Sequence, residues 1–327
     1  MSGSRKFVTL GMFIIDEFAF ADATGTPTGT YAAIGARVWL SASEVGMIVD
    51  KGEDFPQPID AALKTYGESM WLFREQPGTA TTRALNSYTG DHRDFQYLTP
   101  RIRITPCDLT DTPLFRPTTL HFICSPARAA VIMSEVAQIE GWCPVSVYEP
   151  IPDRCVPEEL PALRDVLPFI SVLSPNAEEA LRLLSLPLPP TKPLIEQACN
   201  AFLDFGVGHG GAGWVIIRSG EIGAFIACRT QPGKWLEPYW RTSERVVDVT
   251  GAGNSFLGGL AAGLALRDGD VYEAALFATV SASYTIEQHG LPRITRPSSN
   301  VLGEEWNGDS PWRRLEEFKA RCANDQK

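Results

Sequence analysis

Short apolar runs alternate with helical stretches along most of this chain, and that alternation constrains the fold more than any other feature. The apolar runs, which predict buried strands, are Phe7–Ile15, Thr119–Cys124, Val145–Tyr148, Ile170–Leu173, Trp214–Ile217 and Ile222–Cys228. The stretches that predict helices are Ala127–Ile139, Ala177–Leu184, Pro193–Phe205, Gly253–Leu266 and Val271–Gln288. Strands and helices in this alternation are joined by right-handed crossovers into a mainly parallel sheet covered on both faces. We therefore predict an α/β fold, a three-layer α/β/α sandwich, as a single domain over residues 1–327.

One region, from about Thr79 to Thr105, breaks the alternation. Thr and Arg alternate there with apolar residues, at Thr81–Leu85 and Arg101–Ile104. A period of two predicts strands with one solvated face, as in a small sheet over a larger domain. We expect a small β lid from about residues 17–30 and 79–106. The exposed edges of such a lid offer a route to a homodimer.

Composition excludes several classes of function. The 29 Lys and Arg residues against 39 Asp and Glu give a formal net charge of −10, which repels a phosphate backbone and argues against nucleic-acid binding. No stretch approaches the roughly 20 apolar residues of a membrane span, so no membrane partner is expected. Phe7–Ile15 followed by Ala19-Phe20-Ala21 imitates a secretion signal, but Asp16 and Glu17 interrupt it, and we interpret the run as a buried first strand.

The cysteines point to a reducing compartment, and the histidines do not suggest a metal site. Seven cysteines are scattered without a Cys-x-x-Cys pair, which argues against a disulfide framework or a zinc module and favours the cytoplasm. The four histidines are too far apart in the sequence to suggest a histidine metal site.

Gly206-x-Gly208-x-x-Gly211 matches the dinucleotide-binding pattern, but its context is reversed. That site needs a strand before the glycines and a helix after them, whereas here a helix ends at Phe205 and a strand starts at Trp214. We interpret these glycines as a helix C-cap and turn.

The segment Val246–Asn254 carries the strongest signal for chemistry. A strand-like run leads into Gly251-Ala252-Gly253, three small residues ahead of a long helix rich in glycine and alanine. Backbone N–H groups at such a turn can close around an anion, and the helix dipole adds roughly half a positive charge. The alternative is a glycine-rich turn into a buried helix, because close packing also selects glycine.

Two further segments follow predicted strands. Asn176 and Glu179 lie three residues apart at the start of a predicted helix. A carboxylate there can hold a hydrated magnesium ion, or the two residues can simply cap the helix. Arg218-Ser219-Gly220-Glu221-Ile222-Gly223 either allows close backbone approach to a ligand or forms a hairpin turn.

Taken in order, these three segments resemble the signatures of the ribokinase-like (PfkB) family of carbohydrate and nucleoside kinases. The family signature Asp-x-Thr-Gly-Ala-Gly-Asp reads here Asp248-Val249-Thr250-Gly251-Ala252-Gly253-Asn254. The family's Asn-x-x-Glu falls on Asn176 and Glu179, and its Thr-x-Gly-x-x-Gly loop on Arg218, Gly220 and Gly223. The resemblance runs from about residue 7 to residue 292, and its details look most like the fungal maintenance-of-killer branch.

The resemblance implies a ribokinase-like sandwich that uses ATP and Mg²⁺ to phosphorylate a small metabolite. Gly251, Ala252 and Gly253 would hold the transferred phosphoryl group. The nucleotide would lie against Asn176, Arg218, Gly220 and Gly223, and the acceptor against Asp16, Gly29, Thr30 and Cys124. Glu179 would organise the metal, and a K⁺ ion near Asp248 and Thr250 is a family trait that these positions permit.

The last residue of the signature departs from the family. Asn254 stands where the family has the aspartate that takes a proton from the acceptor hydroxyl, and an amide cannot act as that base. Three hypotheses follow: a weakened kinase, a nucleotide-binding pseudokinase that acts through partners, and a transferase whose anionic acceptor needs no base.

Overall fold

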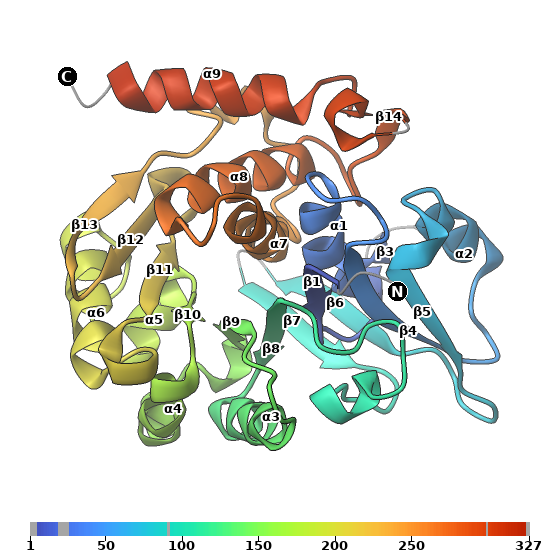
Figure 1. Ribbon diagram of the computed structural model, residues 1–327, viewed down its shortest axis with the longest axis horizontal. Helices are drawn as coiled ribbons and strands as arrows, with labels where there is room; N and C mark the ends of the chain where they lie inside the picture. Colours follow the sequence, from blue (N-terminus) through green and yellow to red (C-terminus); the bar gives the residue numbers. More distant parts are fainter. Residues whose placement is uncertain (1–4, 19–25, 90–91, 299, 325–327) are drawn as a thin grey trace.

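The computed structural model describes residues 5–18, 26–89, 92–298 and 300–324 (Figure 1). Nine strands of these residues form one sheet, in the order β13-β12-β11-β10-β9-β8-β1-β4-β5. Every neighbouring pair from β11 to β5 is parallel, and the hairpin strands β12 and β13 complete one edge in antiparallel pairing. The strands are β1 (Phe7–Thr9), β4 (Val45–Lys51), β5 (Trp71–Glu75), β8 (Thr119–Cys124), β9 (Val145–Pro150), β10 (Val172–Leu173), β11 (Trp214–Arg218), β12 (Ala224–Cys228) and β13 (Gln231–Leu236).

Helices cover both faces of this sheet, which confirms the predicted α/β/α sandwich. One face carries α1 (Tyr31–Arg37), α2 (Gln57–Lys64), α7 (Ala252–Leu266), α8 (Val271–Thr285) and α9 (Pro311–Asn324). The other face carries α3 (Pro126–Gln138), α4 (Leu160–Val166), α5 (Ala177–Leu183) and α6 (Lys192–Phe205). Each face buries its own apolar cluster, as expected for parallel strands that are covered on both sides.

The glycines of α7 let it pack closely against α1 and α8, beside which it lies in Figure 1. A β-carbon at Gly258 would lie 1.9 Å from the carbonyl oxygen of Ala32 in α1, and one at Gly263 would lie 2.6 Å from the Cα of Ala274 in α8. Such contacts leave no space for a side chain, so close packing accounts for the glycine content of this helix.

Three predicted strands differ in the structure. Phe7–Ile15 is divided between β1 and β2 (Ile15–Phe18), because the chain leaves the main sheet after Thr9 and enters a second one. Arg101–Ile104 forms no strand. The carbonyl group of Ile104 instead accepts a hydrogen bond from the guanidinium of Arg128 on α3 (3.0 Å).

The run Val246–Val249 is a loop, not the strand that its apolar residues suggested. The side chains of Val247 and Val249 are 52% and 68% exposed, and the Val247 N–H donates to the Ile286 carbonyl at the end of α8 (2.8 Å). Among the described residues no strand pairs with this segment.

A second sheet of four strands has the order β3-β2-β6-β7, with β3 (Thr26–Pro27), β6 (Arg83–Thr89) and β7 (His92–Tyr97). The strands β3, β6 and β7 fall within the two segments from which we expect a lid, and β2 begins two residues before the first of them. Residues 19–25 and 90–91 of that prediction lie outside the described residues. A short third sheet pairs β14 (Ile294–Arg296) with β15 (Glu305–Trp306). Two roles of the second sheet stay predictions: closing over a ligand and pairing with another copy of the chain.

Charged side chains fasten the C-terminal region to the rest of the molecule. The Arg314 side chain, on α9, is 5% exposed; its guanidinium donates to Ser283 and Glu287 of the α8 region (3.0 and 3.1 Å) and to Asp309 (2.8 Å). It also lies 3.8 Å from the ring centroid of Tyr284. The C-terminal helix α9 is therefore fixed by a buried arginine.

Within the described residues, none of the helices has both the length and the apolar character required to cross a bilayer. No disulfide joins any two cysteines of this part of the chain.

Candidate functional site

The amino end of α7 lies near the carboxyl ends of β9 and β11, and this junction gathers charged side chains. Because side chains alternate along a strand, Glu149 of β9 and Arg218 of β11 point to the same sheet face as the buried Val147 and Ile216, which is the face covered by α7. In parallel sheets, ligand sites form at the carboxyl ends of the strands.

Gly251 opens helix α7 in a conformation that only glycine adopts readily. Its φ is +79°, and the position of an added β-carbon would lie 2.3 Å from the Tyr31 ring. Tyr31 begins α1, is 1% exposed, and its ring therefore packs directly on the turn. Both the backbone conformation and this contact require glycine at position 251.

The backbone N–H groups of the turn are not all available to a ligand. The Ala252 N–H donates to the Val249 carbonyl (3.1 Å), and the Thr250 N–H donates to Oδ1 of Asp248 (2.9 Å). Gly253 and Asn254 follow in the first helical turn, where N–H groups have no acceptor within the helix. Of the predicted donors, the Ala252 N–H is therefore used within the turn, and anion binding by the N–H groups of this segment stays a prediction.

Arg218 forms a buried ionic cluster beside this turn. Its Nη2 donates to Oε1 of Glu149 (2.6 Å) and to the Ser174 carbonyl (3.0 Å), and lies 3.9 Å from Oε2 of Glu179. The three side chains are 11%, 7% and 6% exposed, in the order Arg218, Glu149, Glu179. A β-carbon at Gly253 would lie 2.0 Å from Nη1 of Arg218, so the guanidinium faces the start of α7 directly.

Burial affects the ionisation of both carboxyl groups in the cluster. Loss of solvent raises the pKa of Glu149, although the Arg218 charge acts in the opposite direction. Burial likewise raises the pKa of Glu179 to about 7, with Arg218 opposing and Glu149 adding to the rise. One guanidinium therefore faces two carboxyl groups, both with a raised pKa, and Glu179 changes its charge near neutral pH.

The raised pKa of Glu179 predicts a pH dependence of stability. Its folded-state pKa lies above the unfolded value, so its contribution is fully present below about pH 4.5 and is lost as the pH rises through about 7. We expect the free energy of unfolding, measured by urea titration, to fall by roughly 1–3 kcal/mol between pH 5 and pH 8 on account of this group. Glu179→Gln should flatten that part of the profile, and Glu178→Gln, at the exposed neighbouring position, should not. A wild-type profile that matches the Glu179→Gln profile would contradict the prediction.

Asn176 and Glu179 form a capping box at the start of α5. The Glu179 N–H donates to Oδ1 of Asn176 (2.9 Å), and the Asn176 N–H donates to Oε2 of Glu179 (2.7 Å). This is the capping alternative considered from the sequence.

The charged residues present do not fit a Mg²⁺ ion held by the protein. The carboxylate oxygens of Glu149 and Glu179 nearest the turn face a guanidinium, and Asp248, predicted for a metal, engages the Thr250 N–H and lies 3.5 Å from His289. No group of three or more metal-ligating side chains gathers among the described residues.

The glycines after β11 form the hairpin turn to β12. Gly220 has φ +55° and Gly223 has φ +101°, and the Ser219 N–H donates to the Gly223 carbonyl (2.7 Å). A β-carbon at Gly223 would lie 2.1 Å from the Leu236 carbonyl oxygen. The hairpin therefore requires these glycines. The turn also lies next to Arg218, and a role in nucleotide binding stays a prediction.

The residues predicted for the acceptor divide into two groups. Asp16 is 1% exposed. Burial raises the pKa of Tyr31, and the charges of Asp248 and Asp16 raise it further, which places both carboxylates near the phenol beside Gly251. Thr30, which precedes Tyr31, is fully buried, and an added β-carbon at Gly29 would lie 1.7 Å from the Met12 carbonyl oxygen. A packing contact thus explains the glycine at position 29.

Cys124 does not join this group. It lies at the end of β8 in the apolar cluster covered by α3 to α6, on the opposite face of the sheet from α7. Burial raises the pKa of its thiol to about 12. The alternation of side chains along β8 turns position 124 away from the glycine turn.

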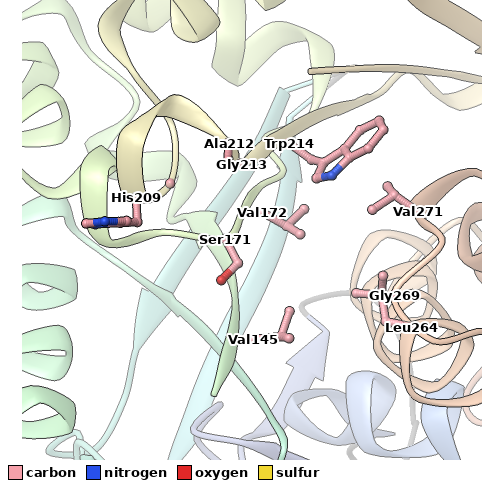
Figure 2. Close-up of a pocket in the computed structure, with 11 residues that line it drawn as sticks. Val145, Ser171, Val172, His209, Ala212, Gly213, Trp214, Leu264, Gly269 and Val271 are labelled. Carbon is pink, nitrogen blue, oxygen red and sulfur yellow. The ribbon is translucent and has the colours of Figure 1, made fainter. Parts of the chain in front are cut away.

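A shallow pocket of about 280 Å³ lies elsewhere, at the amino ends of β9, β10 and β11 (Figure 2). Val145, Val172 and Trp214, the first residues of those strands, contribute to its lining. Because it opens at the opposite strand ends from Glu149 and Arg218, it is separate from the site at α7.

Two residues at this site were not among the predicted site residues. Tyr31 contacts Gly251 from 220 positions earlier in the chain, and Glu149 pairs with Arg218 across 69 positions. The signal for Glu149 was its place at the end of an apolar strand, but no local pattern indicated its partner.

The fold is a ribokinase-like sandwich with a glycine turn at the start of α7, and comparison with known proteins agrees on the fold. The model of the pfkB family carbohydrate kinases matches residues 125–296. An uncharacterized protein of Schizosaccharomyces pombe, C16C9.01c, is 37% identical and covers 96% of this chain and 92% of its own. MAK32 of Saccharomyces cerevisiae is 30% identical over 92% of this chain and 88% of its own length. The chain belongs to the PfkB carbohydrate kinase family, and the similarity to the maintenance-of-killer branch is confirmed.

Solved structures show the same fold. An Escherichia coli ribokinase II candidate in complex with ATP and Mg²⁺ superposes with a TM-score of 0.64 at 21% identity, covering 97% of this chain and 99% of that chain.

Proposed function

We propose that this protein is an ATP-dependent phosphotransferase that acts on a small metabolite. Membership of a carbohydrate kinase family supports the class of reaction, and the E. coli structural relative carries ATP and Mg²⁺. The observation that carries the proposal is the glycine turn: Gly251, with positive φ, opens α7 at the carboxyl edge of the sheet, and Arg218 faces Gly253.

In this proposal the terminal phosphoryl group lies between the first N–H groups of α7 and the Arg218 guanidinium. Phosphoryl transfer depends mainly on positioning and charge stabilisation, and both groups supply positive potential there. Asp16 orients an acceptor hydroxyl near Tyr31, and the turn at Gly220 and Gly223 lies against the nucleotide. Asn254 donates a hydrogen bond and takes no proton, so turnover is slow for a neutral hydroxyl.

A second candidate, a nucleotide-binding pseudokinase that acts through partners, is favoured by the amide at Asn254. Loss of a general base typically costs about 10²–10⁴-fold in rate, which can reduce a kinase to a binding protein. A transferase for an anionic acceptor is the third candidate, because a carboxylate or phosphate acceptor needs no base.

The test combines calorimetry with a transfer assay. ATP binding is measured in the presence of Mg²⁺, and ADP formation is then followed with a panel of sugars, nucleosides, sugar phosphates and small carboxylates. Transfer to a neutral hydroxyl supports the main proposal, transfer only to anions supports the third candidate, and binding without transfer supports the second. The variant Gly251→Val is the control, since positive φ and the Tyr31 ring exclude a side chain there. If ATP does not bind to the wild type, all three fail.

The location in the cytoplasm, the K⁺ ion near Asp248 and Thr250, and a homodimer through the second sheet remain proposals alongside this function.

A further inference from the structure

The carboxyl groups at the candidate site are already paired with a cation of the chain itself. Arg218 Nη2 lies 2.6 Å from Glu149 and 3.9 Å from Glu179, which are the buried carboxyl groups nearest the turn. A guanidinium cannot lose its charge in a protein, so this positive charge is permanent. A divalent ion bound by the same oxygens would have to lie next to it.

Both the backbone and the guanidinium of Arg218 are held by neighbouring groups. The backbone N–H donates to the Pro175 carbonyl (3.1 Å), and in the side chain Nη2 donates to the Ser174 carbonyl (3.0 Å) and to Glu149. Asn176, which caps α5, forms an isolated parallel bridge with Arg218. The side chain is therefore held as part of the folded structure and is not a mobile surface arginine.

Part of the guanidinium remains available and points toward α7. Nη1 is the atom that an added β-carbon at Gly253 would meet, at 2.0 Å, and Nε is buried with no hydrogen-bond partner among the described residues. An unpaired buried N–H group is costly, so the free donors of Arg218 on this side favour a ligand that accepts hydrogen bonds.

The side of the cluster that faces α7 presents hydrogen-bond donors. Glu149 and Glu179 offset the charge of Arg218 on the side of Nη2, whereas Nη1 faces the start of α7. The N–H groups of the first helical turn lie there too, and the helix dipole adds roughly half a positive charge. A guanidinium and backbone N–H groups are also the donors that bind phosphate oxygens with the best geometry.

We propose that Arg218 takes the place of a protein-bound divalent cation at this site, so that a polyphosphate chain binds between Arg218 and the start of α7 without a metal ion. Glu149 and Glu179 position the guanidinium. The inference rests on the proposed function for the identity of the natural ligand, but the binding of the phosphate chain can be tested separately.

The test uses sodium tripolyphosphate as the probe, with calorimetry on the full chain in EDTA and again in Mg²⁺. We expect the wild-type Kd to change by less than threefold between the two conditions. Arg218→Thr should weaken binding in EDTA by at least tenfold, Arg218→Lys should weaken it less, and Arg182→Thr, an exposed arginine on α5, should leave it unchanged. A wild type that loses more than tenfold affinity in EDTA overturns the proposal, and so does an Arg218→Thr variant that binds as the wild type does.

The wild-type comparison needs no variant, so the proposal stays testable if Arg218→Thr fails to fold. ATP transfer is measured in parallel to separate the two proposals. If tripolyphosphate binds without metal but ATP is not turned over, the result supports this inference and opposes the proposed phosphotransferase. If ATP is turned over but tripolyphosphate binds only with Mg²⁺, the result supports the phosphotransferase and opposes this inference.

Discussion

Replacing Asn254 with aspartate is expected to raise the rate of phosphoryl transfer to a hydroxyl acceptor by about 10²–10⁴-fold. The amide at position 254 lies in the first turn of α7, two residues after the start of the helix, and the change to a carboxylate alters its size very little. The carboxylate can accept the hydroxyl proton, which the amide cannot. The change in kcat, measured as ADP release with the best acceptor from the panel, is the readout.

Two control variants accompany this experiment. Asn200→Asp makes the same change of charge on the exposed side of α6 and should not increase kcat. Asn254→Ala removes the amide without supplying a base and should not increase it either. If Asn254→Asp slows transfer, the acceptor is an anion that the new carboxylate repels. If it changes nothing while ATP still binds, the pseudokinase alternative is correct.

Arg314→Ala is expected to lower the free energy of unfolding by about 3–5 kcal/mol. The guanidinium is buried between α8 and α9, and its loss leaves the carboxylates of Glu287 and Asp309 without their shared cation. The packing of the guanidinium on the Tyr284 ring is lost as well. Urea unfolding followed by circular dichroism measures the effect.

The neighbouring arginine provides a matched control for this prediction. Arg313 is on the same helix and also contacts Asp309, but its side chain is 55% exposed. Arg313→Ala should therefore cost no more than about 1 kcal/mol. Equal losses from the two variants would show that burial of the Arg314 charge is not what fixes α9.

The elements with the clearest periodicity were predicted well from the sequence. The predicted strand Thr119–Cys124 matches β8, and the predicted helix Gly253–Leu266 matches α7 to within one residue. The interpretation of Gly206 is confirmed too, since it caps α6 with φ +96°. These elements are determined locally, by side chains that repeat at the spacing of a strand or a helix and by glycine at positions of positive φ.

Other elements depended on distant neighbours. Val246–Val249 has the composition of a strand, yet no strand of the described residues pairs with it. Val247 and Val249 are exposed in a loop that is hydrogen-bonded to the end of α8. The strand β4, which was not predicted, is buried along nearly its whole length because it pairs with both β1 and β5. A strand needs a partner, and the partner is not encoded in the strand's own residues.

At the candidate site, too, some features follow from local sequence and others depend on distant residues. The sequence alone determined the family, the small-residue turn and the loss of a carboxylate at Asn254, because each is a matter of residue type at a fixed spacing. Only the tertiary structure decided that Tyr31 packs on Gly251 and that Glu149 and Glu179 meet the guanidinium of Arg218. Those groups lie on separate strands and helices, and only the parallel order of the sheet brings their carboxyl ends to one place, where burial makes each charge depend on the others.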